Sequence, residues 1–387
     1  MISDNHRCSP NGRLRARGAG VPCAGTPGIL NAITDVAGME VGYSTLIQGE
    51  GALEIGRGPV RTGVTALLPR GRSDVTDGVF AGAFTLNGNG EMTGLPWMEE
   101  TGRVEGPITL TNTHAVGIAR DASIRWMNTV ADSTKLDGNT FWMPLAGETC
   151  DNWLNDMNGS HVRDEQVFAA IDSARGGALA EGSVGGGTGM SCYQFKAGSG
   201  TASRLITLAG QQYTVGVFVQ SNFGVRQLLT VGGIPMGAHF PYSGGQVHRY
   251  LQGHATDQGS IVAIIATDAP LMPHQLKRLA RRGGIGMSRS GGIASNESGD
   301  FFVALSTANR PAFNNSYGVA QFDVLGEFML TPLFEATIQA VDEAILNSLF
   351  AAERMVGRDG NVRDELPVDA VVELLKKHDR WQDPALL

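Results

Sequence analysis

The chain has 387 residues, enough for one large core or two domains, and its 42% hydrophobic and 18% charged residues are typical of globular proteins. A net charge of −8 argues against nucleic-acid binding, and no apolar run reaches the ~18 residues that a membrane-spanning helix needs. The four cysteines match no zinc or redox spacing, so we expect free thiols and no metal site.

Residues 1–27 are rich in Arg, Gly and Pro, and they predict a flexible N-terminal arm. The arm lacks the apolar core of a secretory signal, which favours a cytoplasmic protein. Residues 28–387 are expected to form a single domain. Its first strands are predicted near residues 39–43 and 64–68, where apolar residues alternate or form a short run.

Residues 80–95 contain Asn-Gly-Asn-Gly at 87–90, which predicts a turn. Residues 108–113 predict a strand that leads into a helix, with Thr113 as its N-cap.

Residues 142–146 predict another apolar strand, which runs into Glu148 and Cys150. An acidic residue at the end of a buried strand is well placed to hold the ammonium group of a substrate. A solvated loop glutamate is the alternative on local sequence alone.

The glycine run at residues 182–190 lacks the Gly-Lys-Ser/Thr ending of a P-loop and the context of a Rossmann fingerprint, which argues against nucleotide binding. Residues 205–208 and 213–220 then predict a β-hairpin. Asn222 follows its second strand, where a side-chain amide could donate to an oxyanion. A turn-capping asparagine fits the local sequence equally well.

Residues 232–259 show no periodic spacing of apolar residues, which predicts a loop. The apolar run 261–266 predicts a buried strand, and Gly259-Ser260 stands at the border. If the chain were cut between these two residues, Ser260 would carry a hydroxyl nucleophile beside an α-amine with a pKa near ~7.7–8.0, which can serve as a base. An ordinary junction between loop and strand is the alternative.

The C-terminal part predicts a basic helix at residues 274–282, a tight loop at 283–292 and a strand at 301–306. Ser298 and Asp300 precede that strand and, two residues apart, are expected to point to one side. In isolation they are typical turn formers. A long helix to about residue 352, with Thr331 as its N-cap, and a helix at residues 368–377 complete the chain.

The stretch from Gly259-Ser260 to Pro270 resembles the self-processing site of the DmpA-type aminopeptidases, the family of L-aminopeptidase/D-esterases and β-peptidyl aminopeptidases. Further stretches similar to that family are residues 31–42, 62–65, 80–95, 182–204 and the Val-Gln-x-Asn-x-Gly motif around Asn222. Together they cover most of the chain, from about residue 31 to about residue 343.

The resemblance implies an α+β fold, an αββα sandwich like that of the N-terminal-nucleophile hydrolases but with distinct connectivity. The mixed order of predicted strands and helices agrees with a layered α+β domain. The resemblance also implies self-cleavage into residues 1–259 and 260–387, and a homo-oligomer, a tetramer, of the cleaved heterodimers.

The same resemblance implies the roles of the site residues. Ser260 is the nucleophile with its own amine as base, Ser298 and Asp300 support it, Asn222 holds the oxyanion, and Glu148 binds the free amine of the substrate. Cys150 departs from the family pattern, because some members have there a tyrosine that donates to the oxyanion. A thiol is a weak donor, so we expect Cys150 only to shape the substrate-binding pocket.

The sequence therefore predicts a self-processing serine aminopeptidase that releases N-terminal residues from short peptides, amides or esters, whether of α-, β- or D-amino acids. It needs no metal and no other cofactor, and neither nucleic acid nor membrane is expected as a partner. Two alternatives stay open at this stage: a related oligoamide hydrolase or acyltransferase with the same nucleophile, and an uncleaved, non-enzymatic binding protein.

Overall fold

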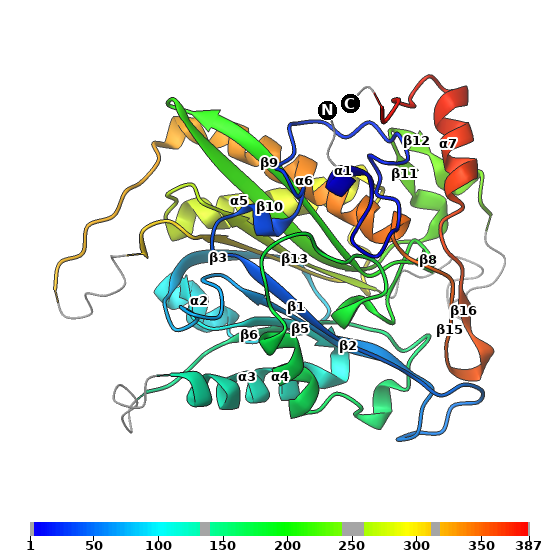
Figure 1. Cartoon of the computed structure of the whole chain (residues 1–387), viewed down its shortest axis with the longest axis horizontal. Helices are drawn as coiled ribbons and strands as arrows, with labels where there is room; N and C mark the ends of the chain where they lie inside the picture. Colours follow the sequence, from blue (N-terminus) through cyan, green and yellow to red (C-terminus); the bar gives the residue numbers. More distant parts are fainter. Residues whose placement is uncertain (1–3, 132–139, 242–258, 311–317, 386–387) are drawn as a thin grey trace.

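The computed structural model describes residues 4–131, 140–241, 259–310 and 318–385. Two stacked sheets lie between two layers of helices, so the predicted αββα architecture is confirmed (Figure 1). The four-stranded sheet has the order β1-β2-β5-β6 and the six-stranded sheet has the order β4-β3-β14-β13-β10-β9. Neighbouring strands are antiparallel except for the pairs β5–β6 and β13–β14.

The four-stranded sheet consists of β1 (Glu40–Gln48), β2 (Val60–Leu68), β5 (Ile108–Asn112) and β6 (Leu145–Thr149). Its outer face is covered by α3 (Val116–Val130) and α4 (Asp164–Asp172). The six-stranded sheet consists of β3 (Val79–Gly88), β4 (Arg103–Val104), β9 (Ser199–Leu208), β10 (Gln211–Asn222), β13 (Ser260–Thr267) and β14 (Gly299–Ser306), covered by α5 (Pro273–Arg289) and α6 (Leu330–Phe350).

Smaller elements surround this framework. They are the helices α1 (Asp4–Arg7), α2 (Leu95–Thr101) and α7 (Val368–Lys377), and the two-stranded ribbons β7 (Ser191–Cys192) with β8 (Phe195–Lys196), β11 (Thr230–Val231) with β12 (Ile234–Pro235), and β15 (Met355–Val356) with β16 (Val362–Arg363). None of the helices in the described part of the chain is long and apolar enough to cross a membrane.

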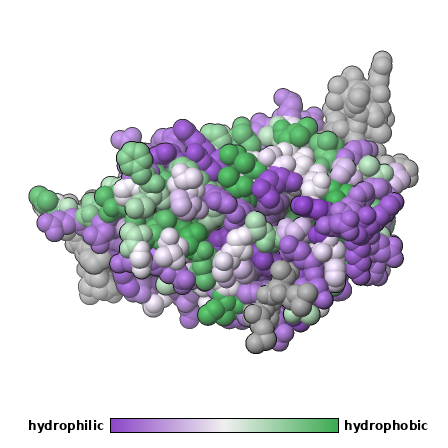
Figure 2. Space-filling model, turned by 90° about the horizontal axis from the view of Figure 1, so that it is seen from above, coloured by the Kyte–Doolittle hydropathy of each residue, from purple (hydrophilic) through white to green (hydrophobic). Residues whose placement is uncertain are grey.

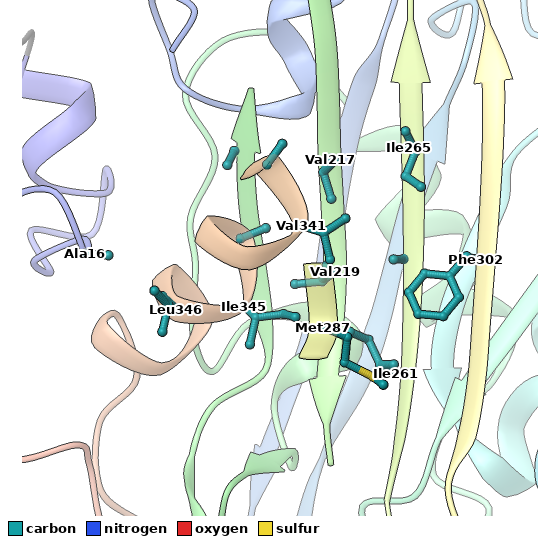
Figure 3. Packing of buried hydrophobic residues seen from close by; sticks show 14 of the residues in the cluster. Ala16, Val217, Val219, Ile261, Ile265, Met287, Phe302, Val341, Ile345 and Leu346 are labelled. Carbon is teal, nitrogen blue, oxygen red and sulfur yellow. The ribbon is translucent and has the colours of Figure 1, made fainter. Parts of the chain in front are cut away.

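Strand β13 shows how the layers place its first residue. Ile261 and Ile265 point into the core beneath α5 and α6, as Figure 3 shows, whereas Val262 and Ile264 belong to the core between the two sheets. Because side chains alternate along a strand, Ser260 faces the same side as Val262. The strand therefore directs Ser260 towards the four-stranded sheet.

The N-terminal segment differs from the flexible arm predicted for residues 1–27. From residue 4 onward it packs against the body of the protein, and Arg15 and Arg17 are 2% and 5% exposed. Arg15 pairs with Glu181 and Arg17 with Glu343, in each case at 2.8 Å. The composition indicated disorder because it does not reveal that these arginines meet buried carboxylates far along the chain.

The tight loop predicted for residues 283–292 is also wrong, because α5 continues to Arg289. The glycines that suggested a loop are instead positions of close packing. A Cβ at Gly283 would lie 2.0 Å from Cδ1 of Phe302, and one at Gly286 would lie 2.7 Å from Cβ of Val341. They let the helix approach β14 and α6.

Two predicted N-caps are corrected as well. The side chain of Asn112, not that of Thr113, accepts the backbone N–H groups at the start of the helical segment after β5, from residues 114 and 115. Thr331 lies within α6, which begins at Leu330. The Thr113 hydroxyl instead donates to the carboxylate of Glu148.

Candidate active site

Ser260 is the first residue of β13 and is 4% exposed. It lies beside Asn222 of the antiparallel strand β10 and beside Gly299 of the parallel strand β14. The backbone N–H of Gly299 donates to the carbonyl oxygen of Gly259 at 3.1 Å and approaches Oγ of Ser260 at 3.3 Å. One donor thus contacts both the serine hydroxyl and the carbonyl of the preceding peptide bond.

A cavity of about 490 Å³ opens in front of Ser260. It lies where the ends of β6 and β13 meet, between the two sheets, so that both sheets contribute to its wall. It is lined by Asn89, Gly90, Thr113, Glu148, Cys150, Asn152, Gly259, Ser260 and Glu297. Two carboxylates in this wall favour a positively charged group in the cavity.

Glu148 lies inside β6, whereas the sequence placed it just after a strand at 142–146. It is 2% exposed, and its carboxylate accepts the backbone N–H of Glu91 at 2.9 Å and the hydroxyl of Thr113. Burial, the largest influence, raises the pKa of this carboxyl. A Cβ at Gly90 would lie 2.7 Å from Oε1 of Glu148, so a side chain at this position would displace the carboxylate of Glu148.

Asn222 is held by two partners that fix the orientation of its amide. Its Nδ2 donates to the carbonyl oxygen of Cys150 at 2.8 Å, and its Oδ1 accepts the backbone N–H of Ser191 at 2.9 Å. The thiol of Cys150 contacts Sδ of Met157 at 3.8 Å, and burial raises the pKa of that thiol to about 11. Cys150 therefore lines the cavity as a protonated thiol and anchors Asn222 through its backbone.

Ser298 and Asp300 flank Gly299 at the start of β14. The hydroxyl of Ser298 donates to Oδ1 of Asp300 at 2.7 Å, and the two residues are 1% and 0% exposed. The sequence predicted that this pair would lie together, and the structure brings it next to the Gly299 N–H that contacts Ser260. The connection between the pair and the serine therefore passes through the backbone of Gly299.

The profile of peptidase family S58 matches residues 31–363 of the chain. The chain belongs to peptidase family S58.

Sequence relatives agree with this S58 assignment. The chain is 50% identical over 373 residues to the β-peptidyl aminopeptidase BapA of Sphingosinicella microcystinivorans, covering 95% of this chain and 93% of the relative. It is 42% identical over 368 residues to the β-peptidyl aminopeptidase BapA of Sphingosinicella xenopeptidilytica, covering 94% and 91%.

Solved structures agree as well. The L-aminopeptidase D-Ala-esterase/amidase of Ochrobactrum anthropi, described as a prototype of the serine aminopeptidases and a variant of the Ntn hydrolase fold, is 41% identical with a TM-score of 0.87, covering 95% of this chain and 99% of that one. A β-aminopeptidase of Burkholderia sp. is 40% identical with a TM-score of 0.83, covering 94% and 99%. This S58 chain is therefore a hydrolase, an aminopeptidase of the N-terminal-nucleophile type.

Some of the residues around this cavity were not predicted from the sequence. Thr113 was assigned to a helix cap, and the backbone contact of Gly299 was not foreseen. Asn152 and Glu297 also line the cavity without having been singled out. The Asn-Gly-Asn-Gly turn was a usable signal for Glu297, because Asn89 in that turn donates to the carbonyl oxygen of Glu297 at 2.7 Å.

Proposed function

We propose that the protein cuts its own chain between Gly259 and Ser260 and then uses Ser260 to release N-terminal residues from short peptides, amides or esters. The observation that carries the proposal is the position of Ser260, which opens a buried strand, faces a carboxylate-lined cavity and follows a carbonyl that accepts the N–H of Gly299. That hydrogen bond polarises the carbonyl that the serine must attack.

The proposed chemistry uses one side chain twice. In the cut, Oγ of Ser260 attacks the carbonyl carbon of Gly259, the acyl group moves from the nitrogen to the oxygen, and water hydrolyses the resulting ester. The products are a carboxylate at Gly259 and a free α-amine at Ser260. In each later turnover the hydroxyl attacks the substrate carbonyl while this amine, with an ordinary pKa near ~7.7–8.0, accepts and returns the proton.

The surrounding residues have matching roles in this proposal. Glu148 pairs with the ammonium group of the substrate, which fits its burial in a wall that contains a second carboxylate. Asn222 donates from its amide to the oxyanion that forms on the substrate carbonyl. Ser298 and Asp300 hold the start of β14 and thereby the N–H of Gly299, and Cys150 shapes the wall of the cavity.

We further propose that N-terminal β-amino acids are accepted as substrates. The supporting observation is that two relatives at 50% and 42% identity are β-peptidyl aminopeptidases and one solved structure is a β-aminopeptidase. A β-amino acid places its amine one carbon farther from the carbonyl, so the distance between Glu148 and Ser260 decides the preference. Release of the aniline from β-alanyl and L-alanyl anilides measures this preference, and turnover of the α-substrate alone would contradict the proposal.

The decisive experiment is an intact-mass spectrum of the purified protein, followed by N-terminal sequencing. We expect two chains of 259 and 128 residues (387 − 259), the smaller one beginning Ser-Ile-Val-Ala. The Ser260→Ala variant should remain a single, inactive chain. An uncut wild-type chain that hydrolyses aminoacyl anilides, or a different new N-terminus, would refute the proposal.

We propose that the enzyme is a homo-oligomer, which the segment 318–329 supports. Its first residues extend away from the body of the protein at the left of Figure 1, whereas Phe322 and Leu325 contact the body through Phe80 and Pro270. Val319 is 91% exposed and Phe328 is fully exposed. In the view from above, apolar residues are more frequent towards that same end (Figure 2). Sedimentation of the Phe328→Ser variant should give a smaller assembly than the wild type, and equal masses would argue against this contact.

A cytoplasmic location is the last part of the proposal. All four cysteines are free thiols, as predicted, which suits a reducing compartment. Fractionation of the native host should recover the activity with cytoplasmic markers, and recovery with periplasmic or secreted markers would contradict it.

A further inference from the structure

Lys196 is a lysine enclosed completely by protein. Its side chain is 0% exposed, and the ion pairs among the described residues do not include it. Its Nζ donates to the carbonyl oxygens of Ala197 at 2.5 Å, Met190 at 2.8 Å and Gly187 at 3.5 Å. Burial lowers the pKa of Lys196 to about 7, but three carbonyl acceptors match the three N–H bonds of an ammonium group, and a neutral amine has only two.

The peptide bond between Met190 and Ser191 connects this ammonium group to Asn222. Its carbonyl oxygen accepts from Lys196, and its N–H donates to Oδ1 of Asn222 at 2.9 Å. The Nδ2 of Asn222 in turn donates to the carbonyl oxygen of Cys150 at 2.8 Å. A continuous series of hydrogen bonds therefore leads from the buried ammonium, through one peptide group, to the amide of Asn222.

Each group in this series strengthens the next. A positive donor on a carbonyl oxygen draws electron density from the amide nitrogen, which makes its N–H a stronger donor, and the same effect is repeated in the side-chain amide. Such cooperative strengthening is about 10–30% per hydrogen bond, and burial preserves it because the surroundings screen poorly. Asn222 has a second hydrogen on Nδ2 and lies beside Ser260 in the sheet.

We propose that Lys196 is a positioning residue that holds the amide of Asn222 in one orientation and strengthens it as an oxyanion donor. It contacts no reacting atom, so it acts only through the Met190–Ser191 peptide and Asn222. The inference rests on the proposed function, since the donor strength of Asn222 matters only if Ser260 creates an oxyanion. It also explains why a charged side chain lies in the interior, where an ammonium is costly to bury.

The first test is the Lys196→Met variant, which keeps the length of the side chain and removes the charge. Turnover of an aminoacyl anilide is expressed per cleaved chain, counted from the small fragment on a denaturing gel. Because an oxyanion donor acts in the transition state, kcat should fall by about tenfold while KM stays within about twofold. The control is Lys277→Met, which removes a partly exposed lysine paired with Glu99 and should leave both constants unchanged.

The second test is a double-mutant cycle, which separates this role from a merely structural one. If Lys196 acts through Asn222, the Lys196→Met change should lower kcat in the wild-type background but hardly at all in the Asn222→Ala background. An equal loss of kcat in both backgrounds, or a loss that appears in KM alone, would overturn the proposal.

A third measurement uses the unaltered enzyme and remains decisive if the variants do not fold or do not cleave. The chain has five lysines, so ¹⁵N labelling of lysine gives few Nζ signals, and slow exchange with water identifies the buried one. A peptide aldehyde should form an anionic adduct on Ser260 and shift that signal. An inhibited enzyme whose buried Nζ signal does not move would refute the role of Lys196.

The two levels of the proposal fail in different ways. Wild-type protein that neither turns over the anilide nor binds the aldehyde refutes the proposed function, and with it this inference. A different outcome refutes only the role of Lys196. In that outcome the wild type is active and is inhibited by the aldehyde, but the effects of Lys196→Met and Asn222→Ala on kcat are additive and the buried Nζ signal does not move.

Discussion

At the scale of single residues, Glu148 combines burial with two hydrogen-bond donors that leave its carboxylate facing the cavity. The raised pKa of Glu148 reflects the free-energy cost of burying a charged carboxylate at this position. A substrate ammonium would offset that cost by supplying an opposite charge. If Glu148 binds the substrate amine as proposed, the carboxylate whose burial is unfavourable becomes a source of selectivity for free amines.

The Glu148→Gln variant should therefore lose activity towards substrates with a free amine and still cut itself. The lost charged hydrogen bond corresponds to roughly 1.5–3 kcal/mol, or about ten- to a hundredfold in kcat/KM. The control is Glu91→Gln, because the exposed Glu91 helps to hold Glu148 through its backbone N–H, which the change retains. An unchanged kcat/KM for the Glu148 variant would remove this residue from the substrate site.

Asp151 is a second buried carboxyl near the cavity, and it links folding to pH. It is 1% exposed, accepts a hydrogen bond from Asn155 at 3.0 Å, and burial raises its pKa to about 7. In the unfolded chain the pKa of an aspartate is about 3.9. Between these two values the folded protein binds more protons, so the contribution of Asp151 to stability falls as pH rises from about 4 to about 7.

Replacing Asp151 by Asn should remove this dependence and raise the melting temperature at pH 8 more than at pH 5. The difference in unfolding free energy is on the order of a few kcal/mol. The comparison is made in the Ser260→Ala background, where we expect a single uncut chain. Asp121→Asn, which neutralises an exposed aspartate, is the matched control. Equal shifts at both pH values for the Asp151 variant would show that this carboxyl does not titrate in the window.

At the scale of elements, the sequence predicts what depends on local patterns. The apolar run of β13 and the whole of α7 lie where periodicity placed them, because strand and helix periods are properties of neighbouring residues. The contact between Thr113 and Glu148 was not predictable, since it depends on the parallel register of β5 against β6, which no local pattern encodes. Likewise, Gly283 in α5 allows a close approach to Phe302, and only the packed structure reveals this contact.

Two neighbouring glycines of α5 provide a matched test of this explanation. Gly283→Ala would put a methyl group into Phe302 and should destabilise the protein by about 1–3 kcal/mol through overpacking. Gly284→Ala meets only the flexible end of Leu86, at 3.0 Å, and should be neutral or stabilising by up to ~1 kcal/mol through helix propensity. Urea unfolding of both variants measures the contrast, and equal stabilities would mean that the glycines merely lower helix propensity.

At the scale of the whole molecule, the proposed cut would divide the chain without dividing the fold. Strands β13 and β14 of the small fragment lie between β3 and β10 of the large fragment in the six-stranded sheet. Helices α5 and α6, also from the small fragment, cover that sheet, and Glu343 of α6 holds both Arg17 and Arg204 of the large fragment. The two fragments therefore share one core and one buried ion cluster.

The fragments should consequently stay together after cleavage until the whole domain unfolds. We expect cleaved wild-type protein and the Ser260→Ala variant to elute at the same volume in native size-exclusion chromatography, because the buried contacts across the cut are the same in both. On a denaturing gel only the wild type should separate into two bands. Cutting also frees the paired strands from their covalent link, so unfolding of the wild type should depend more steeply on protein concentration than unfolding of the variant. A cleaved sample whose fragments elute apart under native conditions would mean that β13 and β14 are not held as central strands, which the strand order requires.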